Sequence, residues 1–204
     1  MARRSISCNV AIYPSQGILQ KALKISRLLR KRGGVFVLDN RRFYPHVTLY
    51  MTEFPVKNLG RITQALYRIA ANTPPFHIRC MRYKQHEGYI DVRFQKSRGI
   101  LHLHRKVVRA LNPLREGFIR RKDSVRSRQL SEQKQRNLRQ YGYDSVHAAF
   151  SPHLTFSKIR KGPAIVLRSL PGHDFSFRAE RITLFGSGAY GTCRKLISQF
   201  KLSG

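Results

Sequence analysis

Tryptophan is absent from the 204 residues of this sequence, and cysteine and acidic residues are scarce. Cys8, Cys80 and Cys193 lie far apart and lack CxxC spacing, so the sequence indicates neither a disulfide framework nor a zinc site. We expect free, buried thiols in a reducing compartment, and a cytoplasmic protein. No long apolar run is present, which excludes a membrane-spanning helix, and no apolar segment of a secretory signal follows the basic first residues.

Positive charge dominates the composition. Forty Lys and Arg against ten Asp and Glu give a formal net charge of +30. A chain with this charge repels itself, which favours a polyanionic partner, and we expect RNA or an oligonucleotide. General solubility, or a lineage whose proteins are all basic, would give the same composition.

The hydrophobic pattern predicts an α+β fold with antiparallel sheets and helices on their outer faces. Alternation over 6–12 predicts an early strand, and apolar spacing over 18–29 predicts an amphipathic helix. The basic stretch 18–32 would also suit a mitochondrial presequence, but the early strand favours a fold that starts at once. We expect one bilobal domain over 1–204, acting as a monomer, with further strands and helices at about 35–38, 46–50, 59–69, 76–80, 90–94, 100–111, 153–156, 182–184 and 196–202.

The segment 105–139 carries twelve Lys or Arg against three acidic residues. Few apolar residues lie between 124 and 139, so we expect a solvated helix or a mobile loop at about 115–140. It is either a charged surface excursion, or a clamp for the RNA backbone or a lid over the site. In the second case Arg120, Arg121 and Lys122 are candidate substrate-binding residues.

One motif occurs twice, as Pro45-His46-Val47-Thr48 and Pro152-His153-Leu154-Thr155. Two copies should arise by chance in fewer than about one in ten thousand such sequences. Side chains two residues apart on a strand point to the same face, so each histidine projects together with its threonine. Two such strands would place two imidazoles and two hydroxyls around one cleft.

These groups suit cleavage of a phosphodiester. One histidine, His46 or His153, can take a proton from the attacking oxygen while the other protonates the leaving oxygen, because imidazole has an ordinary pKa of about 6.5. Thr48 and Thr155 can donate hydrogen bonds to the phosphate oxygens. This chemistry needs neither a metal nor a cofactor.

At these residues the chain resembles the 2H phosphoesterase superfamily, which includes 2′-5′ RNA ligase-like proteins and 2′,3′-cyclic nucleotide phosphodiesterases. That group is defined by two His-x-Thr/Ser-x motifs in two lobes, and the similarity extends to 137–143 and 182–185. The resemblance implies two lobes related by a pseudo-twofold axis, with the active site between them. It also implies an enzyme acting on RNA 2′,3′-cyclic phosphate ends or 2′-5′ linkages. Hydrolysis of a small cyclic or 2′-5′-linked nucleotide, and a non-catalytic RNA-binding subunit of a ribonucleoprotein, are the alternatives.

Other residues indicate less. Tyr44, Tyr50 and Tyr190 could stack a base at the cleft or simply pack beside the strands. His102 and His104 lie two apart in a predicted helix, and we expect both at the surface.

Overall fold

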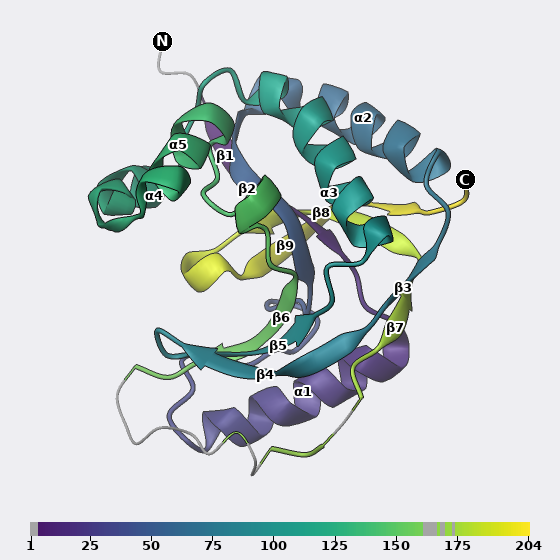
Figure 1. The fold of residues 1–204 in the computed structure, drawn as a ribbon, viewed down its shortest axis with the longest axis vertical. Helices are drawn as coiled ribbons and strands as arrows, with labels where there is room; N and C mark the ends of the chain where they lie inside the picture. The colour runs from purple at the N-terminus through teal and green to yellow at the C-terminus, as the bar shows by residue number, and fades with distance from the viewer. Residues whose placement is uncertain (1–3, 161–166, 168–169, 173) are drawn as a thin grey trace.

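A computed structural model describes residues 4–160, 167, 170–172 and 174–204 (Figure 1). The strands are β1 Ser5–Ile12, β2 Val47–Pro55, β3 Phe76–Ile78, β4 Cys80–His86, β5 Tyr89–Phe94, β6 His153–Lys158, β7 Phe177–Ala179, β8 Arg181–Ser187 and β9 Cys193–Lys201. The α-helices are α1 Gln16–Arg30, α2 Leu59–Ala71, α3 Arg98–Leu111, α4 Arg121–Arg126 and α5 Glu132–Tyr141. The predicted α+β class is confirmed.

The two motif strands belong to different antiparallel sheets. A four-stranded sheet has the order β2-β1-β8-β9, and a three-stranded sheet has the order β4-β5-β6. β3 and β7 form a short separate pair. β2 and β6 are therefore edge strands of their sheets, and they contact each other. This contact brings the two motifs together.

Each sheet is covered by helices on its outer side (Figure 1). α2 and α3 pack on the four-stranded sheet, whereas α1, from the first half of the chain, packs on β6 of the other sheet. The apolar stripe of α1 is buried as predicted, and Ile25 and Leu29 are inaccessible to solvent. The first half thus contributes to the core of both lobes, and one large hydrophobic cluster runs through them.

Both motif strands contain a β-bulge at the same place in the motif. Val10 and Ala11 of β1 face Tyr50 and Thr48, so Leu49 is an extra residue in β2. Ile90 and Asp91 of β5 face Ser157 and Thr155, so Phe156 is the extra residue in β6. A bulge reverses the faces of all residues beyond it. The matching bulges are an independent sign that the two halves are equivalent.

The strand expected at 35–38 does not form. Gly34 makes one isolated bridge to Ile159, and Val35 N–H donates to the Lys158 carbonyl at 2.8 Å. Beyond this point the backbone forms hydrogen bonds with side chains and not with another strand. Phe36 O accepts from Ser157 Oγ, and Leu38 N–H donates to Ser26 Oγ. The segment therefore lies beside β6 without extending its sheet.

None of the described helices is long and apolar enough to cross a membrane. The three cysteines are free thiols, and Cys8 and Cys193 are buried whereas Cys80 is partly exposed.

Candidate active site

The contact between β2 and β6 lies at a cleft of about 410 Å³. His46, Thr48, His153 and Thr155 all line it. Val47 and Leu154, the intervening motif residues, are fully buried on the opposite faces of their strands. The structure therefore brings together the four side chains that the repeated motif predicted.

The two imidazoles are held in the same way. His46 Nδ1 lies 2.7 Å from the Tyr44 carbonyl oxygen, and His153 Nδ1 lies 2.8 Å from that of Ser151. A carbonyl oxygen only accepts, so each Nδ1 carries a proton and donates it. In the neutral ring, Nε2 then has the lone pair and is the nitrogen that can exchange a proton with a substrate.

Burial lowers the pKa of both histidines. The pKa of His153 falls to about 4, because desolvation outweighs its bond to Ser151 and because Arg93, His46 and His86 add positive charge. Burial likewise lowers the pKa of His46, opposed by its hydrogen bond to the Tyr44 carbonyl. Both rings are therefore neutral near pH 7, and a phosphate anion beside them would raise both pKa values.

Thr48 is oriented by a residue outside the motif. Asn9 on β1 is fully buried, and its Nδ2 donates to Thr48 Oγ1 at 2.9 Å. Since the threonine oxygen accepts this bond, its own proton remains available for another acceptor in the cleft. Sequence reasoning missed Asn9; the available signal was an amide placed between the apolar residues Cys8 and Val10.

A charged cluster lies beside the second motif. Arg93 faces His153 across the β5–β6 pair, and its Nε lies 2.7 Å from Oδ1 of the fully buried Asp91. Arg93 Nη1 also donates to Ser151 Oγ at 3.0 Å, and His86 Nδ1 lies 3.2 Å from Asp91 Oδ2. Burial raises the pKa of Asp91 to about 6, against the effect of Arg93. Arg93 is thus held where its charge disfavours protonation of His153.

The comparisons with known proteins agree with this geometry. The family model described as "Protein of unknown function (DUF1045)" matches residues 54–164, slightly more than half of the chain. The chain belongs to the DUF1045 family. No curated protein sequence matches it.

Solved structures share the fold of the DUF1045 chain over nearly its whole length. Apo LigT of E. coli is 17% identical with a TM-score of 0.61, and TT0787 of Thermus thermophilus is 16% identical with a TM-score of 0.61. Each alignment covers 98% of this chain and 99% of the other. A structure titled only as a phosphoesterase is 16% identical, covers 98% and 100%, and has a TM-score of 0.60. The fold predicted from the 2H phosphoesterase resemblance is confirmed.

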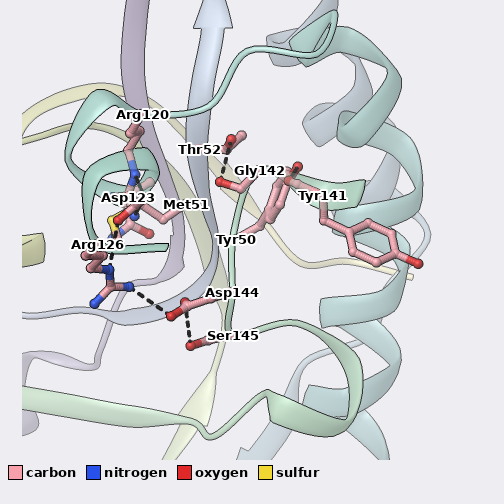
Figure 2. Close-up of polar contacts among 11 residues, drawn as sticks. Tyr50, Met51, Thr52, Arg120, Asp123, Arg126, Tyr141, Gly142, Asp144 and Ser145 are labelled. Carbon is pink, nitrogen blue, oxygen red and sulfur yellow. Dashed lines mark hydrogen bonds and ion pairs between the residues drawn. The ribbon is translucent and has the colours of Figure 1, made fainter. Parts of the chain in front are cut away.

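The three predicted tyrosines of the DUF1045 chain have different positions. Tyr44 and Tyr190 line the cleft, and Tyr44 packs on Phe185 at 5.2 Å between ring centroids. Contrary to the prediction, Tyr50 is only 1% exposed, and its hydroxyl donates to the Tyr141 carbonyl at 2.5 Å (Figure 2). The bulge at Leu49 is the reason, because it turns Tyr50 to the core face.

The basic segment of the DUF1045 chain is helical and reaches the cleft. Its part at about 115–140 forms α4, a 3₁₀ turn η3 (Ser127–Gln129) and α5. Arg120 and Lys122 line the cleft, whereas Arg121 is exposed and does not. Of the three predicted substrate-binding cations, the structure therefore places two at the site.

His104 is buried rather than exposed, which corrects the prediction. It is fully inaccessible on α3, and its ring stacks on Phe150 at 4.0 Å. Its Nδ1 donates to the Leu49 carbonyl at 2.8 Å, and its Nε2 accepts from His147 N–H at 3.0 Å. His104 thus links the bulge of β2 to the turn η4 (His147–Ala149) that precedes β6. The exposed His102 agrees with the prediction.

Proposed function

We propose that the chain is a metal-independent phosphodiesterase that acts on RNA 2′,3′-cyclic phosphate ends or 2′-5′ linkages. The observation that carries this proposal is the pair of equivalent His-x-Thr units at one cleft, each histidine with Nδ1 bonded to a backbone carbonyl. E. coli LigT, which has the same fold, has been solved with 3′-AMP and with ATP, which supports a nucleotide substrate here.

The reaction needs two coupled proton transfers. Nε2 of one neutral histidine takes a proton from water or a ribose hydroxyl as that oxygen bonds phosphorus. The bond from phosphorus to the leaving 2′ or 3′ oxygen breaks, and the other histidine, protonated, gives this oxygen its proton. The substrate anion favours that protonation, because it raises the lowered pKa values of His46 and His153. Ligation is the same path in reverse.

Thr48 and Thr155 stabilise the charge that builds up on the non-bridging oxygens. Both hydroxyls line the cleft, and Thr48 retains a free proton because its oxygen accepts from Asn9. Because Asn9 already orients the Thr48 hydroxyl, this donor needs no reorganisation during the reaction.

The test is turnover of a short RNA that ends in a 2′,3′-cyclic phosphate, with chelator present. His46→Ala and His153→Ala should each lose about 10²–10⁴ in rate, the usual contribution of one acid or base. His102→Ala is the matched control, because this histidine is exposed on α3 and does not line the cleft. Wild-type activity should follow a bell-shaped pH profile.

The charge of +30 also suits a second function, an RNA-binding subunit without catalysis. Wild-type protein that binds RNA at low salt, shows no turnover of cyclic or 2′-5′-linked substrates, and keeps its affinity in both histidine variants would favour this function. Turnover of mononucleotides alone would instead favour a hydrolase of small nucleotide signals.

A further inference from the structure

Residues 120–134, which we call the basic wall, form one side of the cleft. The wall comprises Arg120, α4, η3 and the start of α5 (Figure 1). Its cleft-lining members are Arg120, Lys122, Asp123, Arg126, Leu130 and Lys134. The proposed catalytic groups lie instead on β2, on β6 and at His46 directly before β2, so the wall adds charge to the cleft from a separate segment.

Arg120 is held in a fixed position yet has an unused donor. It is 3% exposed, and its Nε donates to Asp123 Oδ2 at 2.5 Å (Figure 2). The Tyr143 ring lies 5.9 Å from its guanidinium carbon. Nη1 is buried and has no hydrogen-bond partner among the described residues. A buried donor without an acceptor is costly, and Arg120 itself is one of the residues that line the cleft.

Asp123 of the wall and the neighbouring Asp144 are already paired. Asp123 also pairs with Arg126 Nε at 3.4 Å, and Arg126 Nη2 donates to Asp144 Oδ2 at 2.8 Å. Lys122 and Lys134 have no hydrogen bond or ion pair with any described residue. Four cations of the wall line the cleft, against the three carboxylates of Glu87, Asp123 and Asp144, and the wall's two lysines are free to meet an anionic ligand.

The wall lies near the β4–β5 hairpin, which also lines the cleft. Burial lowers the pKa of His86 on this hairpin, and the charge of Lys134 lowers it further. Burial raises the pKa of Tyr89, and the charge of Arg126 opposes this rise. The anion site is therefore bounded by α4 and α5 on one side and by the hairpin on the other.

We propose that the basic wall binds a second phosphate group, next to the one that is cleaved, so that the preferred substrate is an RNA end of at least two nucleotides. This inference rests on the proposed function of the same cleft. A volume of about 410 Å³ lies within the range of about 300–1,000 Å³ that is usual for ligand pockets. The neighbouring internucleotide phosphate is the group of an RNA end that carries the required negative charge.

The test compares two dinucleotides that end in a 2′,3′-cyclic phosphate and differ only in the linkage between their nucleosides. One has the natural phosphate and the other an uncharged methylphosphonate. Wild type should prefer the charged linkage by about tenfold in kcat/KM, which corresponds to two partly exposed charge contacts. Lys122→Gln/Lys134→Gln should lower this preference to about twofold or less. Arg121→Gln, adjacent on α4 but outside the cleft, should keep it.

Equal turnover of the two dinucleotides by wild type would overturn the inference, as would an undiminished preference in the lysine double variant. If neither substrate is turned over, the proposed function fails and the subsite is tested by binding. Calorimetry would then compare a dinucleotide with a terminal phosphate and its methylphosphonate counterpart. A charge preference that the double variant lacks would support the subsite, and its absence in wild type would refute it. The lysines serve as probes because removal of Arg120 would leave Asp123 buried without its closest partner.

Discussion

His104 should make the stability of the protein depend on pH. In the folded chain its Nε2 must stay unprotonated to accept from His147 N–H, and burial lowers its pKa from 6.5 to about 4. The unfolded chain therefore takes up a proton below about pH 6.5, while the folded chain does so only near pH 4. Stability from this residue is complete above about pH 6.5 and is lost as the pH falls toward 4.

The size of the effect follows from these two pKa values. Between about pH 7 and pH 5, the difference in proton uptake should remove about 2 kcal/mol from the free energy of unfolding, rising to about 3 kcal/mol near pH 4. The repulsion within a chain of net charge +30 also grows in acid, so wild type alone cannot isolate this contribution.

A variant that does not titrate provides the comparison. In His104→Gln the amide oxygen can still accept from His147 N–H, but nothing at this position gains a proton between about pH 7 and pH 5. Urea unfolding at several pH values should show wild type more stable at neutral pH, with this advantage shrinking by about 2 kcal/mol toward pH 5. A constant difference would refute the argument that His104 is held neutral. His102→Gln, at an exposed position of α3, should follow the wild-type curve.

Three further outcomes are expected. Asn9→Ala should lower kcat by about tenfold by releasing the Thr48 hydroxyl, with a smaller loss when Thr48→Ala is already present. Tyr50→Phe should lower the free energy of unfolding by about 1 kcal/mol, by loss of the bond to the Tyr141 carbonyl, and leave kcat unchanged. Inorganic phosphate should bind with uptake of protons at about pH 7, because the anion raises the lowered pKa values of His46 and His153.

Each of these outcomes has a counterpart that would contradict it. Strictly additive losses in Asn9→Ala and Thr48→Ala would mean that the amide does not act through the hydroxyl. A fall in kcat in Tyr50→Phe would mean that Tyr50 contributes to the active site. Calorimetry of phosphate in buffers of different ionisation enthalpy would show no buffer dependence if the histidines were already protonated.

Local patterns predicted the parts of this fold that depend on local sequence. The repeated motif placed both histidines and both threonines at one cleft, since alternation fixes which side chains share a face. The apolar stripe of α1 likewise predicted its buried face. His104 could have been found too, because it continues the buried stripe of Ile100, Val107 and Leu111 on α3.

Other features depend on which distant segments pair, and alternation does not reveal this. The bulge at Leu49 arises from the pairing of β1 with β2, and it moved Tyr50 away from the expected face. Asn9 and Arg93 reach the motifs across neighbouring strands, so their roles follow from register rather than from spacing. The segment 35–38 had the composition of a strand, but its backbone forms hydrogen bonds with the side chains of Ser157 and Ser26 instead of with another strand.

The matching bulges also restrict the register in which the two motif strands can pair with their neighbours. A strand that slips by one residue exchanges its faces, and here such a slip would present Val47 and Leu154 to the substrate. At Leu49 and Phe156 each strand has two residues where its neighbour has one, so a slipped pairing would have to re-form the bulge elsewhere. The bulge that turns Tyr50 away from the cleft therefore also fixes the register of β2, and the matching bulge fixes the register of β6 independently.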